Sequence, residues 1–283
     1  MPDLAPPDLA SLRTEIDRID DALHDLLMRR ADLVAHMAAS RVKQGGPTFR
    51  PGREAMILRR LLERNRGALA RPAVVRFWRE IIASSLAQQG GFSVATQGEA
   101  GVESPLARLA RAHFGLLTPL RLHPTPTRVL ASLASGEAAV AVLPLPQEGE
   151  RPEAAWWAQM ESPRLHIVAA LPFLAPLEAS RDGGREKAPP QAFAISPLAP
   201  DATGRDRSLL RFEPLPEHSR ARILSLLTQA GLPPRWLLRR ESPTPMALAE
   251  IEGFLAEGDP RLGALPFPRL QILGAYAEPE PEE

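Results

Sequence analysis

A three-four repeat of apolar residues near the start of the chain constrains the fold more than any other feature. From residue 9 to residue 37 the apolar positions are separated alternately by three and four residues, the spacing of a coiled-coil seam. The seam residues are Leu9, Leu12, Ile16, Ile19, Leu23, Leu26, Leu33 and Met37. A helix over residues 9–44 would extend about 54 Å, longer than a small domain is wide. We therefore predict one long helix that pairs with a second copy of itself.

Arg30 occupies a seam position where the repeat predicts leucine. A guanidinium in an apolar stripe is costly unless an anion meets it. Arg41 lies within about 20° of the same line, since each helical residue turns by about 100°. Two interpretations remain open. The helix face holds an anion between helices, or it is a plain coiled coil in which Arg30 extends its charged end to water.

Two shorter helices are predicted after a Gly-Gly-Pro break at residues 45–47. They cover residues 53–65 and 72–89, and Gly90-Gly91 ends the second. The inner stripe of this third helix reads Val74, Trp78, Ile81 or Ile82, Ser85 and Gln89. Ser85 and Gln89 are four residues apart and share a face. Either the helix end is exposed there, or both side chains point into the site that receives Arg30 and Arg41.

The composition limits the classes of function. The 283 residues are enough for two or three domains, and 34 basic residues balance 34 acidic ones. Zero net charge argues against nucleic-acid and membrane partners. The chain has no cysteine, and we find no zinc-ligand spacing and no phosphate-binding loop. With no signal peptide and no long apolar run, we expect a cytoplasmic protein without a metal.

Beyond residue 91 the pattern alternates between strands and helices, which indicates an α/β layer. Predicted strands cover residues 92–96, 119–123, 138–145 and 165–171, and helices cover 105–114 and 127–134. The charged segment 173–190 contains proline and glycine and is expected to be mobile.

The last part of the chain predicts a small βαββ domain with its own antiparallel sheet. A strand is expected at residues 193–195, before this domain. The strands of the domain are expected at residues 209–212, 235–239, 246–251 and 270–273, with a helix at 220–230 and a short helix ending at 259–262. The acidic tail after Tyr276 is expected to be disordered. The predicted fold class is multidomain, α plus α/β, with domains at residues 1–91, 92–205 and 206–283.

Residues on the three N-terminal helices together resemble the AroQ-class (type II) chorismate mutases over about residues 9–90. The residues that carry the resemblance are Arg13, Arg30, Arg41, Arg53, Glu54, Ser85 and Gln89. The resemblance implies an intertwined three-helix homodimer with two active sites. It also implies chorismate as the substrate and no cofactor.

The resemblance assigns a role to each of these residues. Arg30 and Arg53 would bind substrate carboxylates within one subunit, and Arg13 would enter the site across the subunit interface. Glu54 would hold the substrate hydroxyl. Gln89 would donate to the ether oxygen, with Ser85 assisting at a carboxylate. Arg41 falls where the family usually has lysine, a donor to the ether oxygen and a carboxylate. Lys43 is nearby but lies on another side of the helix, so we predict that Arg41 is this donor.

The second half resembles a reduced prephenate dehydratase followed by an ACT-like regulatory domain. Val142-Leu-Pro-Leu145 and Thr203-Gly-Arg-Asp-Arg-Ser-Leu-Leu210 are similar to dehydratase segments, and Leu273-Gly-Ala-Tyr276 is similar to an ACT strand. Gln191-Ala192-Phe193 stands where the dehydratase threonine motif is expected. Arg220-Ala221-Arg222 replaces the Gly-Ala-Leu of phenylalanine-binding ACT domains. We therefore expect this half to be catalytically silent.

These observations predict a chorismate mutase that forms prephenate in phenylalanine and tyrosine biosynthesis. One alternative is an isochorismate pyruvate lyase on the same helical scaffold. The other is a non-catalytic dimerising or ligand-sensing protein, against which the intact set of polar site residues argues.

Overall fold

The computed structural model describes residues 8–44, 48–99, 101–102, 104–160, 165–179 and 185–283, and it leaves out the side chains of residues 41–44, 179, 185 and 186. These residues form two compact units. The first comprises Met1–Thr48 and Gln88–Gly90, and the second comprises Phe49–Ala87 and Gly91–Glu283. Each unit is described by itself.

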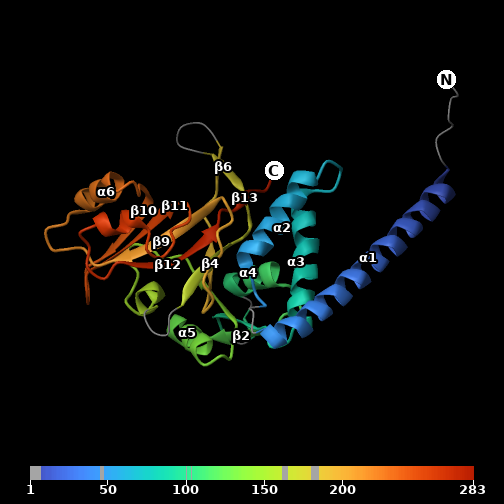
Figure 1. Cartoon of the computed structure of the whole chain (residues 1–283), viewed down its shortest axis with the longest axis horizontal. Helices are drawn as coiled ribbons and strands as arrows, with labels where there is room; N and C mark the ends of the chain where they lie inside the picture. Colours follow the sequence, from blue (N-terminus) through green and yellow to red (C-terminus); the bar gives the residue numbers. More distant parts are fainter. Residues whose placement is uncertain (1–7, 45–47, 100, 103, 161–164, 180–184) are drawn as a thin grey trace, which may run out of the picture. The chain divides into compact units, whose positions relative to one another are not determined.

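Helix α1, Leu9–Gln44, runs without interruption for 36 residues, as predicted (Figure 1). Asp8 caps its start, because its Oδ1 accepts a hydrogen bond of 2.7 Å from the backbone N–H of Ser11. In the single chain the apolar seam is exposed along its whole length, from 44% for Leu12 to 71% for Leu9. Apolar surface of this extent is typical of an interaction site.

The two shorter N-terminal helices are confirmed within two residues of their predicted bounds. Helix α2 covers Pro51–Arg64 and helix α3 covers Arg71–Gln88. Pro51 opens α2, where its missing N–H costs nothing. The apolar face of α2 packs with Val74 and Val75 of α3 and with Phe173 from the second half of the chain.

Nine strands of the described chain form one mixed sheet in the order β10-β11-β9-β12-β4-β8-β3-β1-β2. Strands β1 and β2, β1 and β3, and β12 and β4 pair in parallel, and the other neighbours are antiparallel. The bounds are β1 Val94–Gln97, β2 Leu120–His123, β3 Val140–Pro144, β4 His166–Leu171, β8 Ala192–Ser196, β9 Asp206–Phe212, β10 Pro234–Arg240, β11 Met246–Glu252 and β12 Gln271–Ala277.

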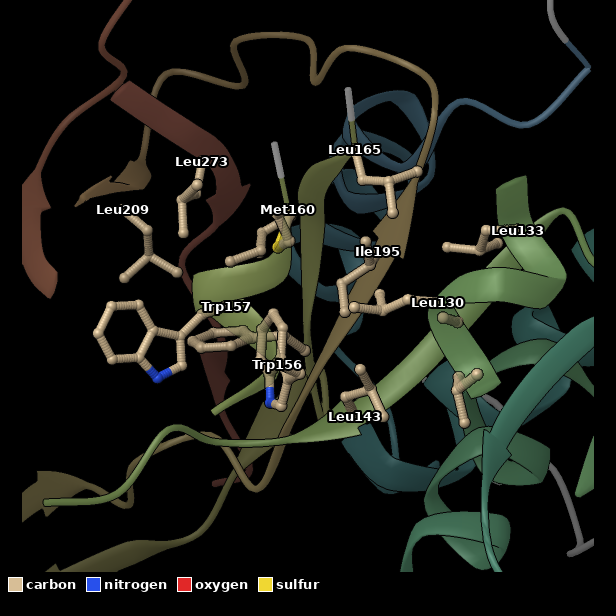
Figure 2. Packing of buried hydrophobic residues seen from close by; sticks show 14 of the residues in the cluster. Leu130, Leu133, Leu143, Trp156, Trp157, Met160, Leu165, Ile195, Leu209 and Leu273 are labelled. Carbon is tan, nitrogen blue, oxygen red and sulfur yellow. The ribbon is translucent and has the colours of Figure 1, made fainter. Parts of the chain in front are cut away.

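Helices cover both faces of this sheet, because alternate side chains of each buried strand point to opposite sides. Helix α5, Pro126–Ala134, and the 3₁₀ helix η1, Trp156–Gln159, pack on the face that carries Ala141 and Leu143 of β3 (Figure 2). Helix α4, Pro105–Phe114, and the end of α3 pack on the face of Val140 and Val142. Helix α6, Arg220–Gln229, covers β9, β10 and β11, and a second 3₁₀ helix, η2, spans Pro260–Ala264.

The predicted small antiparallel sheet is not separate. Strands β9 to β12 do pair antiparallel, but β12 also pairs in parallel with β4. All four strands therefore belong to the nine-stranded sheet. Gly274 makes this junction possible. Its φ is +142°, and a Cβ there would lie 2.1 Å from the carbonyl oxygen of Ile167. The boundaries predicted at residues 91 and 205 stay predictions.

Two segments expected to lack structure contain short strands. Residues 173–190 include β5 Leu174–Ala175, β6 Leu177–Ala179 and β7 Arg185–Lys187, although residues 180–184 lie outside the described residues. The acidic tail forms β13, Glu280–Pro281, which pairs with β5. Glu280 is buried, and its Oε1 accepts a 2.7 Å hydrogen bond from Nε of the buried Arg59 on α2. An internal arginine partner thus orders an acidic segment whose composition predicted disorder.

Candidate functional site

The residues predicted to form the substrate site are divided between the two units. Gln89 lies just beyond α3, yet it groups with α1 in the first unit. The first unit therefore carries Arg13, Arg30, Arg41 and Gln89, and the second carries Arg53, Glu54 and Ser85.

In the first unit, Arg30 differs from its neighbours on the seam. It is half-buried, whereas Leu26 and Leu33 on either side are 63% and 59% exposed. This burial lowers the pKa of Arg30 from its ordinary value. Gln89 is also half-buried, and Arg13 is exposed. The side chains of Arg41 and Lys43 lie outside the described residues, so the choice between them stays a prediction.

In the second unit, Glu54 is buried and forms an ion pair with a residue that the sequence analysis did not select. Its Oε2 accepts a hydrogen bond of 3.1 Å from Nη1 of Arg79 on α3, and both side chains are at most 10% exposed. Burial raises the pKa of Glu54 to about 7, although the guanidinium opposes the shift. Burial likewise lowers the pKa of Arg79 to about 10, opposed by Glu54. A carboxylate in the first turn of a helix is often explained by the helix dipole alone. The buried pairing of Glu54 with Arg79 shows that this explanation is not sufficient here.

The guanidinium of Arg79 is enclosed by apolar and aromatic groups. Its Cζ lies 5.4 Å from the centre of the Phe173 ring, and its Nε has no hydrogen-bond partner among the described residues. His113 on α4 is buried as well, and its pKa is well below the ordinary value because of burial and the nearby charge of Arg79. His113 is therefore neutral near pH 7.

A sequence signal for Arg79 was present on α3. The predicted inner stripe included Trp78 and Gln89, but both are only half-buried. The buried residues of α3 are Val74, Val75, Arg79, Ile82, Ala83, Ser85 and Leu86. Val75, Ile82, Ala83 and Leu86 have helical spacing with Arg79 among them, so a stripe displaced by one residue contains a charge on an apolar line.

The remaining two predicted residues have contrasting environments. Arg53 is exposed in the first turn of α2. Ser85 is buried, and its Oγ donates a hydrogen bond of 2.8 Å to the carbonyl oxygen of Ile81. The interpretation that the end of α3 is already exposed at Ser85 is therefore wrong.

The chemistry available from these residues is anion binding and hydrogen bonding. Four arginines, a carboxylate and two neutral polar groups suit a substrate with carboxylates and a hydroxyl. In the part of the chain that the structure describes, no group of three or more His, Asp or Glu side chains could hold a metal ion. Within the same residues, no helix combines the length and apolarity required to cross a membrane.

Comparison with known proteins finds a family similarity in the N-terminal segment. Residues 12–90 match the model of the family Chorismate mutase type II. This segment contains all seven of the predicted site residues.

Two curated relatives extend the similarity beyond this segment. A bifunctional chorismate mutase/prephenate dehydratase of Stutzerimonas stutzeri is 36% identical over 38% of this chain and 30% of its own length. Its counterpart in Pseudomonas aeruginosa is 32% identical over 50% of this chain and 40% of its own length. The match thus spans well under half of these relatives. Among solved structures, prephenate dehydratase from Streptococcus mutans aligns with a TM-score of 0.45 and 17% identity, covering 66% of this chain and 98% of that chain.

Proposed function

We propose that the protein is a chorismate mutase and that its three N-terminal helices catalyse the rearrangement of chorismate to prephenate. The observation that carries the proposal is the match of residues 12–90 to the type II chorismate mutase family. The Arg, Glu and Gln residues of that segment that carry the resemblance support it, because a helical scaffold alone does not require them.

The reaction is an intramolecular Claisen rearrangement of a dianion. One carbon–oxygen bond breaks at the ether while one carbon–carbon bond forms, and no group leaves the molecule. The protein has to hold the flexible substrate in a compact chair and stabilise charge on the ether oxygen, which positioning and preorganised electrostatics can supply. The proposed mechanism therefore assigns no cofactor.

Each proposed site residue supplies one part of this arrangement. Arg30 and Arg53 of one subunit bind the two carboxylates, because a guanidinium forms paired hydrogen bonds and stays charged. Arg41 and Gln89 donate to the ether oxygen, Ser85 assists at a carboxylate, and Glu54 accepts from the substrate hydroxyl. Oε2 of Glu54 already accepts a hydrogen bond of 3.1 Å from Nη1 of Arg79. In the proposal, Oε1 is therefore the atom that accepts the hydrogen bond from the substrate hydroxyl.

We further propose that the active form is a homodimer in which Arg13 reaches the site of the partner subunit. The exposed seam of α1 supports this arrangement, because a second α1 is a partner of matching length and polarity. Arg13 lies about 100° around the helix from Arg30, so the two arginines face different chains.

The test is a product analysis with purified protein. Chorismate and isochorismate are each supplied, and the products are separated by chromatography. Chorismate should be consumed and prephenate should accumulate. Salicylate from isochorismate at a higher kcat/KM would favour the lyase, and no turnover of either compound would favour a non-catalytic protein.

A matched pair of variants links turnover to the proposed site. Arg30→Ala should lower kcat/KM for chorismate by about a hundredfold or more, whereas Arg29→Ala, its exposed neighbour, should leave it within about twofold of wild type. The same samples, supplied with prephenate at neutral pH, should form no phenylpyruvate above the uncatalysed rate. Equal activity of the two variants would reject the site assignment.

A further inference from the structure

A cavity of about 420 Å³ lies within the second unit, and none of the seven proposed substrate-site residues lines it, although Arg79 in its wall pairs with Glu54. It is bounded by α3, α4, the segment that follows β4 and the C-terminal end of the chain. Its volume is in the range of small-molecule sites. Val75, Leu109 and Phe173 supply apolar wall, and Arg79 lines the cavity beside them.

The buried cation gives this cavity a specific electrostatic character. Arg79 is 4% exposed, and its Nη1 donates a hydrogen bond to Glu54. The Nε of Arg79 has no acceptor within the described residues. A buried cation whose donors are only partly matched favours an anion in the cavity beside it. His113 also lines the cavity but is neutral near pH 7, because burial and Arg79 lower its pKa.

The rim adds two further cations at the solvent side. Arg76 on α3 and Arg111 on α4 are exposed and line the cavity together with the carboxylates of Glu80 and Glu282. Glu80 is already engaged, since its Oε1 accepts a hydrogen bond of 3.1 Å from the backbone N–H of Leu116. The lining thus contains three arginines and an apolar wall, and Nη1 of Arg111 donates a hydrogen bond of 2.9 Å to the carbonyl oxygen of Leu116.

We propose that this cavity binds a small organic carboxylate with an apolar or aromatic body. The carboxylate meets the guanidinium groups of Arg79, Arg76 and Arg111, and the body packs on Val75, Leu109 and Phe173. A bare inorganic anion would make no contact with the apolar wall, and an uncharged apolar molecule would leave the guanidinium groups without an anion. The proposal does not depend on the proposed function, because its test measures binding and not turnover.

The experiment is a calorimetric titration of the full chain with three probes at neutral pH. The probes are 3-phenylpropanoate, its uncharged analogue 3-phenylpropan-1-ol, and acetate. We expect 3-phenylpropanoate to bind one site per chain, and the alcohol and acetate to bind at least about tenfold more weakly, the usual effect of losing a charge-assisted hydrogen bond or the apolar contact.

Variants locate the site and separate its two components. Arg76→Ala and Arg111→Ala should each weaken the binding of 3-phenylpropanoate several-fold and leave the binding of the alcohol unchanged. Arg108 is exposed on α4, the helix of Arg111, but lies outside the cavity, so Arg108→Ala should bind both probes like wild type. Leu109→Trp fills the cavity and should abolish binding of the acid. The double variant Glu54→Gln/Arg79→Met removes both buried charges together and should reduce the preference for the acid over the alcohol, because only the rim guanidinium groups remain.

Two results would overturn the proposal. One is equal affinity of the wild-type protein for the acid and the alcohol. The other is wild-type affinity of the acid for Leu109→Trp and for both rim variants. Circular dichroism of each variant establishes that it is folded, and the exposed rim variants decide the question if the buried double variant does not fold.

Discussion

At the scale of single residues, two arginines lie on apolar stripes of the N-terminal helices. Arg30 was found from its place on the seam of α1. Arg79 follows the same rule on α3, and its burial becomes intelligible once Glu54 is seen to pair with it at 3.1 Å. A buried charge requires a partner of opposite charge. A charged residue on an apolar stripe therefore predicts that such a contact exists, but the sequence does not show which residue makes it.

The titration of Glu54 should appear in the stability of the protein. The folded protein keeps the proton on Glu54 up to about pH 7, while the unfolded chain loses it near the ordinary pKa of 4.5. Between these values the folded state binds more protons, so stability falls as pH rises through the window. Arg79 titrates near pH 10 and stays charged throughout it. The decrease should approach about 3 kcal/mol, since one pKa unit is about 1.4 kcal/mol.

Denaturant unfolding from pH 4.5 to 7.5 measures this effect. The free energy of unfolding of wild type relative to Glu54→Gln should fall over that range. The same measurement on Glu63→Gln, which changes an exposed glutamate on the same helix, is the matched control. A wild-type curve parallel to that of Glu54→Gln would show that Glu54 titrates outside the window.

Gln89 offers a sharp test of the proposed site, because its neighbour is also glutamine. Gln89→Ala should lower kcat/KM for chorismate by about 10²–10³, the usual cost of one preorganised donor. Gln88→Ala, exposed in the last turn of α3, should retain wild-type kinetics. Steady-state kinetics of both variants provide the comparison, and near-wild-type turnover of Gln89→Ala would remove Gln89 from the mechanism.

At the scale of elements, α1 is the part of the chain whose own sequence predicts a partner. Its seam residues are between 44% and 71% exposed in the single chain. A helix with one apolar stripe is stabilised by burying it, because isolated helices gain little from backbone hydrogen bonds alone.

A charge on the seam should therefore disrupt self-association. Leu23→Glu places a carboxylate at the centre of the stripe in both copies, and the dimer dissociation constant should rise at least about a hundredfold. Ala35→Glu adds the same charge on the opposite side of α1 and should leave association unchanged. Sedimentation equilibrium measures both. Identical dimers for the two variants would mean that the seam is not the interface.

Gly274 is the critical residue of the sheet. Its positive φ and its close approach to Ile167 leave no space for a side chain. Gly274→Ala should destabilise the protein by roughly 2 kcal/mol or more through steric overlap and backbone strain. Gly258→Ala, with φ +83° and open space around it, should cost about 1 kcal/mol. Thermal unfolding compares the two, and equal shifts in Tm would argue against a tight junction between β12 and β4.

At the scale of the whole molecule, the proposed sites draw on two chains. Arg13 and Arg30 lie on different sides of α1, yet both are assigned to the substrate. If one subunit supplies Arg30 and the other supplies Arg13, two inactive variants can restore each other. This property distinguishes a shared site from one contained within a single chain.

Mixing Arg13→Ala with Arg30→Ala chains should recover activity. Random pairing makes about half of the dimers mixed, and each mixed dimer has one site with both substitutions and one with neither, so roughly a quarter of the sites are intact. Activity should rise from near zero to about that fraction after refolding together. Proven subunit exchange without recovery, or a monomer by light scattering, would contradict the shared site.

The sequence alone determined the elements whose signals are local. The three-four seam predicted α1, and alternating patterns located most strands within a few residues, since short-range sterics and periodic burial govern both. The same local reasoning selected Arg30, because a charge on an apolar seam is visible in the spacing.

Only the tertiary structure decided the features that depend on distant partners. It joined β12 to β4 in one sheet, ordered the acidic tail by pairing Glu280 with Arg59, and placed Arg79 against Glu54. Each of these brings together groups far apart in the chain, and composition or periodicity carries no record of such pairings. Whether a charge is solvated or buried beside an opposite charge is set by the space that other elements leave around it, which is a property of the folded molecule.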